Sequence, residues 1–326
     1  MFVNSHTHLY SGLAPLGMPA ASPRPATFVE ILERVWWRLD RAIDEKSLRA
    51  AARYYVAAAR RAGTAVLIDH HESPNAIEGS LDVLAGACAE FGMAAVLCYG
   101  ATERNGGRDE ARRGLEECRR FIRDNRRPRI TGVVGLHASF TVSDDTMREA
   151  GDLCRELNTV LHIHLAEAAA DVEDARRRGY EGPLERLAAL GALVPGSILA
   201  HGVHLTAEQV RRAGDAGCWL VQNPRSNRNN GVGYAHSLRG TARVALGTDG
   251  FASDMREEAR VLAAIAAGEG DVPDPSEERL AAGWEVSRER LGLGPEDTPA
   301  ADPPPIDFAA IEADARAEAA KLWARW

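Results

Sequence analysis

The stretch Phe2-Val3-Asn4-Ser5-His6-Thr7-His8 opens the chain with a short apolar run that ends in two histidines one residue apart. Alternate side chains of a strand point to the same face, so both imidazoles would lie on one side of it. Similar apolar segments ending in ionisable residues recur before His137, around His162 to Glu167, before His201 and before Asp249. The pattern predicts several strands that each end at one shared site.

Strand-like and helix-like segments alternate along the chain. We expect strands at 1–4, 64–68, 94–99, 130–136, 160–164, 197–200, 218–221 and 243–246, and helices between them, among them 28–40, 48–61, 79–90, 109–124, 144–157 and 208–215. Repeated strand–helix units predict a parallel sheet, and eight units close a (β/α)8 TIM barrel of the α/β class. Catalytic residues of that fold lie at the C-terminal ends of the strands, where the polar residues fall.

The whole chain, 1–326, is expected to form one barrel domain. A Pro/Gly-rich segment, 268–305, follows the last barrel unit, and the helix 308–326 after it carries apolar residues along one face. We expect this last helix to dock on the barrel.

The composition argues against some kinds of binding partner and favours one cellular location. A net charge of −8 without a basic stripe argues against nucleic-acid and membrane surfaces. No apolar run approaches the ~18 residues of a membrane span. Five scattered cysteines without a CxxC pair predict a reduced, cytoplasmic protein. We therefore expect a small-molecule substrate as the partner, and allow for a homo-oligomer.

Four side chains are candidates for metal ligands. His6 and His8 share a strand face, and imidazoles suit a borderline divalent ion. Of the second pair, His162 and His164, we interpret His164 as the ligand, because Glu167 follows at three residues and could share the water of the metal. Asp249 at the mouth of the eighth strand could ligate the ion and accept a proton from that water.

Other residues are candidates for catalysis and substrate binding. His201 would orient the nucleophile or the leaving group, and His137 would hydrogen-bond the substrate. In Asp69-His70-His71-Glu72, alternation sends one histidine inward, and we interpret His71 as a substrate contact. Trp36 could wall an aromatic pocket, although a helical tryptophan is more often a core residue.

The lysines give a further constraint. The chain has only Lys46 and Lys321, and neither lies at a strand end, so a bridging carbamylated lysine has no candidate. A single metal ion is favoured.

These features together resemble the amidohydrolase superfamily. Within it, the resemblance is to the aminohydrolase and chlorohydrolase branch, and there most to the SsnA-like members. The resemblance runs from residue 1 to about Met255. It rests on residues 2–11, 36–40, 69–77, 135–140, 162–167, 223–227 and 247–255.

The resemblance implies one metal ion held by His6, His8, His164 and Asp249, with zinc favoured and iron or manganese as alternatives. It also implies that Glu167 shuttles protons to the leaving nitrogen and that His201 polarises the reacting group. One departure stands out: the accessory β-sandwich usual in the family is expected to be lacking, since this sequence begins at the first barrel strand.

The expected activity is a metal-dependent deaminase that attacks an sp² C–N bond of a small amino-heterocycle or amidine-like compound with activated water. A hydrolytic dechlorinase or a cyclic amidase would use the same residues. A non-hydrolytic lyase or cyclase, or a catalytically degenerate barrel, are further alternatives. Glu167, which metal binding does not need, argues against the degenerate barrel.

Overall fold

The computed structural model describes residues 1–297 and 306–326. Its strands form one parallel sheet in the order β1-β2-β3-β5-β6-β7-β8-β9, with β4 paired to β3 off this path. The strands are β1 (Phe2–Thr7), β2 (Thr64–His71), β3 (Ala94–Ala101), β4 (Ile130–Gly132), β5 (Val134–Ala138), β6 (Leu161–Leu165), β7 (Ile198–His201), β8 (Trp219–Gln222) and β9 (Val244–Leu246). This confirms the predicted (β/α)8 barrel.

The fourth barrel strand differs from the expected continuous segment 130–136. It is divided at Val133, so that the first half of β3 pairs with β4 and its second half with β5. Val133 still donates its N–H to the carbonyl of Leu97, 3.0 Å away, so β3 keeps a partner across the break.

The barrel closes where the first strand meets the segment after the last one. A parallel bridge joins Thr7 and Asp249. The N–H groups of Thr248 and Asp249 both donate to the carbonyl of His6, at 2.9 and 3.0 Å. This seam places the end of the first strand directly beside the segment after the last strand, although the two are far apart in the sequence.

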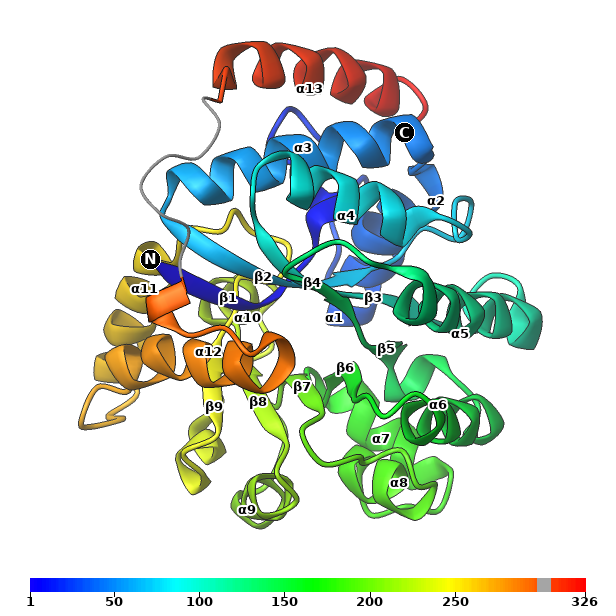
Figure 1. Ribbon diagram of the computed structural model, residues 1–326. Helices are drawn as coiled ribbons and strands as arrows, with labels where there is room; N and C mark the ends of the chain where they lie inside the picture. Colours follow the sequence, from blue (N-terminus) through cyan, green and yellow to red (C-terminus); the bar gives the residue numbers. More distant parts are fainter. Residues whose placement is uncertain (298–305) are drawn as a thin grey trace.

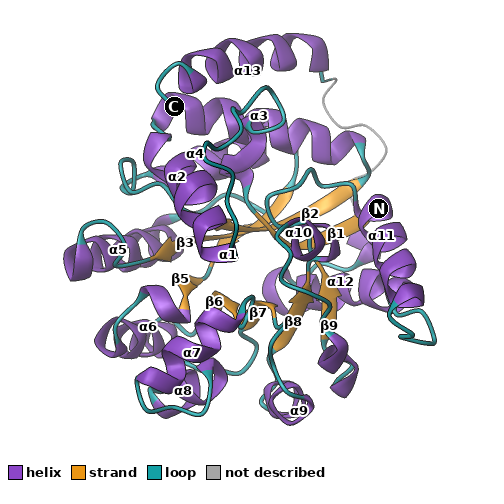
Figure 2. Cartoon of the chain, turned by 180° about the vertical axis from the view of Figure 1, so that it is seen from behind, coloured by secondary structure: helices purple, strands orange, loops and turns teal. Residues whose placement is uncertain are grey.

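Helices cover the outside of the barrel (Figures 1 and 2). They are α1 (Phe28–Ile31), α2 (Trp37–Ala42), α3 (Glu45–Arg61), α4 (Ser80–Glu90), α5 (Gly107–Asp124), α6 (Asp144–Glu156), α7 (Ala169–Arg177), α8 (Pro183–Ala189), α9 (Ala207–Asp215), α10 (Pro224–Asn229), α11 (Met255–Gly268), α12 (Ser276–Leu291) and α13 (Phe308–Trp323). Five short η segments complete the described part: η1 (Leu9–Leu13), η2 (Leu32–Trp36), η3 (Ser139–Thr141), η4 (His236–Gly240) and η5 (Pro295–Asp297).

Local sequence explains how several helices begin and end. Asp44 and Ser47 form a reciprocal capping box at the start of α3, and Thr206 with Gln209 does the same for α9. Glycines with positive φ, including Gly63 at 88°, follow the last residues of helices, as a left-handed C-cap requires.

The expected helix 28–40 is present but interrupted. Between α1 and α2 lies η2, a π-helical turn in which Trp37 donates its N–H to Leu32, five residues back. Such turns frequently lie at functional sites. Here the turn carries Leu32 and Trp36, which line the pocket described below.

The C-terminal part is more helical than the expected Pro/Gly-rich segment 268–305. Helix α12 occupies its middle, and positions 298–305 lie outside the described residues. Helix α13 lies along α3 at one edge of the molecule (Figure 1), with Ile311, Ala315 and Leu322 buried against it.

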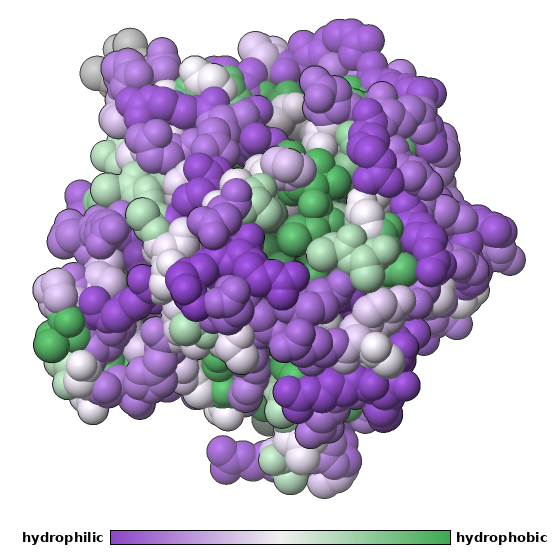
Figure 3. All heavy atoms as spheres, turned by 90° about the horizontal axis from the view of Figure 1, so that it is seen from below, coloured by the Kyte–Doolittle hydropathy of each residue, from purple (hydrophilic) through white to green (hydrophobic). Residues whose placement is uncertain are grey.

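The core consists of apolar strand residues and the inner faces of the helices. All five cysteines are buried and free. The face seen in Figure 3 is mostly hydrophilic, with a smaller apolar area near its middle. Among the described residues, no helix combines the length and apolar character needed to span a bilayer.

Candidate active site

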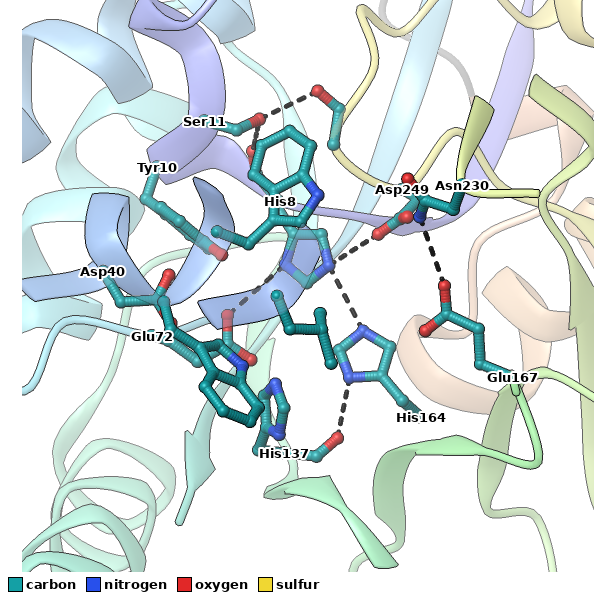
Figure 4. Close-up of a pocket in the computed structure, with 14 residues that line it drawn as sticks. His8, Tyr10, Ser11, Asp40, Glu72, His137, His164, Glu167, Asn230 and Asp249 are labelled. Atoms are coloured by element: carbon teal, nitrogen blue, oxygen red, sulfur yellow. Dashed lines mark hydrogen bonds and ion pairs between the residues drawn. The ribbon is translucent and has the colours of Figure 1, made fainter. Parts of the chain in front are cut away.

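A pocket of about 460 Å³, its open mouth included, lies at the C-terminal ends of the barrel strands. Side chains from distant parts of the chain line it (Figure 4): His8, Tyr10, Ser11, Leu32, Trp36, Trp37, Asp40, Glu72, His137, His164, Glu167, Asn230, Asp249 and Gly250. In the barrel fold this end of the strands carries the chemistry.

Four side chains converge at the base of the pocket. The ligand atoms of His6, His8, His164 and Asp249 all lie within 4.8 Å of one another. Oδ1 of Asp249 lies 2.8 Å from Nε2 of His8 and 3.5 Å from Nε2 of His6. The structure therefore brings together the four residues predicted as ligands.

Hydrogen bonds behind these imidazoles fix which nitrogen faces the pocket. Nδ1 of His8 lies 2.5 Å from the carbonyl of His70, and Nδ1 of His164 lies 2.7 Å from the carbonyl of His137. A carbonyl only accepts, so each Nδ1 carries a proton and each Nε2 is the ring nitrogen that faces the pocket. Nδ1 of His6 contacts Nε2 of His162 at 2.9 Å, which places His162 behind the ligand group.

The donor set fits a divalent cation. Nε2 of His8 and Nε2 of His164 lie 3.2 Å apart, close enough for both to reach one ion. Nε2 of His6 is buried and has no hydrogen-bond partner in the described part of the chain. Burial lowers the pKa of His8, but Asp249 and Glu72 outweigh burial and raise it to about 10, so this spot favours positive charge. Three imidazole nitrogens and one carboxylate oxygen suit zinc and similar ions.

A second group of ionisable side chains lies beside the first. Ligand-type atoms of Glu167, His201 and Asp249 again lie within 4.8 Å of one another. Burial raises the pKa of Glu167 to about 7, and the charge of Asp249 adds to this, while His201 opposes it. A carboxyl group that titrates near neutrality can both accept and donate a proton.

Helix α10 holds this second group in place. Oδ1 of Asn227 lies 2.8 Å from Nδ1 of His201, so Nε2 of His201 is left buried, 3.6 Å from Glu167 and without a hydrogen bond to any residue that the structure describes. Ser226 donates its hydroxyl to Oδ2 of Asp249. Asn230, just after the helix, contacts Glu167 at 3.4 Å.

Backbone strain is concentrated at the same place. Ala166, His201 and Asp249 adopt φ values of 51°, 76° and 54°, in the left-handed region that favours glycine. Such residues persist where the surrounding structure holds them, and they are enriched at active sites. Here the turns aim the side chains of His201, Asp249 and, after Ala166, Glu167 at the pocket.

An aromatic wall faces the ionisable groups. Trp36 and Trp37 both line the pocket, together with Leu32 from the same π-helical turn. The ring of Trp36 lies against Gly250, where a Cβ would approach it to 3.1 Å. His137 lines the pocket beside His164, with ring centroids 5.4 Å apart. The structure thus places Trp36 and His137 in the pocket lining, and their contact with a substrate stays a prediction.

The prediction for His71 is wrong. Its Nε2 contacts the hydroxyl of Ser73 at 2.8 Å and its ring packs against Tyr99, on the outer side of β2. His70 points inward instead, with its ring centroid 4.5 Å from that of His164. Strand alternation allowed either phase, and it is His70 and Glu72 that face the site.

Several residues of the pocket had no predicted role. Among them are Tyr10, Asp40, Glu72 and Asn230, which line it, and the same holds for Ser226 and Asn227, which contact Asp249 and His201 from behind the lining. The stretch 223–227 follows the seventh barrel strand, so its position alone could have indicated residues that support the site. Asp40 belongs to the stretch 36–40 that carries the resemblance, but it had no role of its own, because a single acidic residue on an amphipathic helix is usually solvated.

The model of the amidohydrolase family matches residues 2–284, so the chain belongs to that family. It is 27% identical over 261 residues to the 5-methylthioadenosine/S-adenosylhomocysteine deaminase of Pyrococcus abyssi, covering 78% of this chain and 58% of that protein. It is 28% identical over 270 residues to the 8-oxoguanine deaminase of Pseudomonas aeruginosa, covering 77% and 59%. The chain therefore spans a little under three fifths of these curated relatives.

Solved structures share the fold. An adenosine deaminase from Xanthomonas campestris with bound zinc superposes with a TM-score of 0.81 at 22% identity, over 98% of this chain and 84% of the other. An atrazine chlorohydrolase from Arthrobacter aurescens in complex with zinc gives a TM-score of 0.70 at 20% identity, over 89% and 70%.

Proposed function

We propose that the protein is a metal-dependent deaminase that hydrolyses an sp² C–N bond of a small amino-heterocycle or amidine-like compound. The observation that carries this is the pair of adjoining groups, one of ligand type and one of proton-transfer type, which meet at Asp249. The named relatives are deaminases of purine compounds, which supports the same reaction class. A small-molecule substrate is part of this proposal.

One divalent ion, with zinc favoured over iron or manganese, would be held by His6, His8, His164 and Asp249. When bound, such an ion lowers the pKa of a water ligand towards roughly 7 and so supplies a nucleophile at neutral pH.

The protein side chains would move the protons. Asp249 and Nε2 of His201 lie where they can accept a proton from the attacking water, and His201 is oriented for this by Asn227. Glu167, with its pKa near 7, would pass a proton to the leaving nitrogen. His137 and Trp36 would orient the ring of the substrate. Proton transfer of this kind contributes ~10²–10⁴-fold to the rate.

The test is ammonia release from a panel of aminated heterocycles by zinc-loaded protein, repeated in ¹⁸O-labelled water. Deamination predicts ammonia together with ¹⁸O in the product, and Glu167→Gln should keep its metal while losing ~10²–10⁴-fold in turnover. Chloride release from a chlorinated analogue, or a product without the label, would replace the proposal by dechlorination or by a non-hydrolytic step.

Elemental analysis tests the ligand set separately. His164→Ala and Asp249→Ala should lose the metal, whereas His162→Ala, which removes a residue behind the ligands, should retain it. Metal loss only in His162→Ala would overturn the assignment. The cytoplasmic location and a homo-oligomer stay predictions.

A further inference from the structure

We propose that Glu72 binds substrate, and that the pocket wall it forms with Asp40 selects neutral or cationic compounds with an N–H edge away from the reacting carbon, against anionic ones. This rests on the proposed function of the same pocket. In Figure 4, Asp40 and Glu72 lie on the side of the pocket opposite Glu167 and Asn230.

The contacts of His70 fix the position of Glu72. Nε2 of His70 lies 3.0 Å from the carbonyl of Leu136, which can only accept, so this nitrogen carries a proton. Nδ1 of His70 lies 2.7 Å from Oε1 of Glu72. The two side chains therefore form a close buried pair, with exposed side-chain fractions of 0% and 2%.

The two side chains of this pair lie at different depths relative to the pocket. Glu72 lines the pocket, whereas His70 does not. The carboxyl group of the pair thus faces the ligand, and the imidazole lies behind it. A buried carboxylate held in this way binds donors strongly, because charge-assisted hydrogen bonds are about twice as strong as neutral ones.

The barrel leaves space for the pair by means of a glycine. A Cβ at Gly100 on β3 would lie 2.4 Å from Cε1 of His70 and 2.6 Å from Oε1 of Glu72. Any larger residue at this strand position would displace both side chains. The sequence of β3 is therefore compatible with the pair only with glycine at this position.

A second pair, formed by Arg104 and Asp40, has the same arrangement, with the carboxylate facing the pocket. Nη2 of Arg104 lies 2.9 Å from Oδ2 of Asp40, and Arg104 stacks 4.9 Å from the ring centroid of Trp37, behind the wall. Asp40 lines the pocket and is 2% exposed, and its Oδ1 has no hydrogen-bond partner among the described residues. An unpartnered buried acceptor at a pocket wall points to a ligand donor.

The rest of the lining fits the same class of ligand. No lysine or arginine belongs to the described lining, whereas Asp40, Glu72, Glu167 and Asp249 do. A phosphate or carboxylate group on the substrate would approach these oxygens in a poorly solvated space, where like charges repel strongly. Trp36 and Trp37 supply faces for a planar ring and, for a cationic one, a cation–π contact.

The test compares three nearly isosteric ligands of different charge: benzamidine, benzamide and benzoate. Binding to zinc-loaded protein is measured by isothermal titration calorimetry. We expect benzamidine to bind at least tenfold more tightly than benzoate, with benzamide between them. Benzoate binding as tightly as benzamidine would overturn the proposal on the wild-type protein alone, whether or not any variant folds.

Variants then locate the effect. Glu72→Gln should weaken benzamidine at least tenfold while changing benzamide less than threefold, with the zinc content unchanged. Gly100→Ala should weaken benzamidine as well, whereas Gly86→Ala, where a Cβ meets nothing within 4 Å, should not. A charge preference that persists in Glu72→Gln would exclude Glu72 as its source.

The outcome is separable from that of the proposed function, because binding needs no turnover. Charge selection without ammonia release would leave this inference standing and remove the deaminase. Ammonia release with equal affinity for all three ligands would do the reverse.

Discussion

The side-chain amide of Asn227 decides which nitrogen of His201 carries a proton. Of the two amide contacts to Nδ1, the one to Oδ1 of Asn227 is the shorter, at 2.8 Å against 3.3 Å to Nδ2 of Asn223. With the proton on Nδ1, Nε2 can accept a proton next to Glu167, and no other described residue hydrogen-bonds to it. A partner that fixes a tautomer in this way acts through the histidine and is a positioning residue.

Asn227→Ala should therefore lower kcat by about 10–100-fold, the usual effect of losing such a partner, while leaving the metal content unchanged. Asn229→Ala on the exposed side of the same helix is the matched control and should be neutral. Steady-state kinetics on a substrate from the deamination panel provide the measurement. An unchanged kcat for Asn227→Ala would show that His201 needs no fixed tautomer.

The sequence was sufficient to predict the ligand-type residues, but not which side chains of every strand point into the barrel. His6 and His8 lie two residues apart, so they share a face whichever way the strand is turned. His70 and His71 are adjacent, and only the phase of β2 decides between them. All of β2 is buried, so no polar face in the sequence marks its outer side.

At the scale of elements, the C-terminal end of α13 holds the segment that carries the aromatic wall. Nε1 of Trp323 donates to the carbonyl of Leu16 at 3.2 Å, and Arg325 contacts Asp44 at 2.9 Å and the carbonyl of Ala42 at 3.3 Å. The family match ends at residue 284, so this helix lies beyond it. Fixing residues 16–44 at several points limits the motion of α1, η2 and α2.

Replacing both Trp323 and Arg325 by alanine should raise KM several-fold, with kcat and metal content nearly unchanged, because the reacting groups belong to other elements. Hydrogen exchange over residues 28–42 should become faster. The control is Lys321→Ala, whose side chain is 66% exposed and pairs with Glu318 on the helix itself. A fall in kcat with KM constant would contradict this role.

The order and type of most elements follow from the sequence, but their interruptions do not. Eight apolar segments that alternate with helical patterns suffice to predict the barrel. The break at Val133 and the π-helical turn at 32–36 depend on the packing of β3 and of the pocket wall. The local pattern of apolar residues in the sequence contains no information about this packing. The same holds for α12, because its amphipathic pattern is weak and Gly- and Pro-rich stretches flank it.

At the scale of the whole molecule, buried carboxyl groups make stability depend on pH. Asp171 is 3% exposed and accepts the N–H of Ala166 at 2.7 Å, and burial raises its pKa to about 7. The unfolded value is about 3.9. Between these values the folded chain keeps a proton that the unfolded chain has lost. The contribution is therefore complete below about pH 4 and lost as the pH rises through about 7.

Asp171→Asn removes this titration. The difference in unfolding free energy between wild type and variant should fall by up to a few kcal/mol between pH 4.5 and 7.5, since each pKa unit corresponds to about 1.4 kcal/mol. Urea unfolding at a series of pH values measures it. A difference independent of pH would show that Asp171 is ionised in the folded protein throughout this range.

Closure of the barrel and metal binding should be one coupled property. The proposed ligands come from β1, β6 and the turn after β9, so an ion would link both sides of the seam. Asn4 links the same sides without touching a ligand: Oδ1 accepts from the N–H of Thr248 at 3.1 Å, and Nδ2 donates to Thr248 and Ser253 at 2.7 and 3.0 Å.

Zinc at 100 times its Kd should therefore stabilise the whole protein by about 2.7 kcal/mol, seen as a higher Tm that a chelator reverses. Asn4→Ala should lower the Tm of the metal-free protein, because three buried hydrogen bonds are lost, and should also weaken zinc binding at least tenfold. Calorimetric melting with and without zinc, together with a zinc titration, measures both effects. An Asn4→Ala protein with lower stability but unchanged zinc affinity would mean that the ligands are held in place by their own strands, independently of the seam.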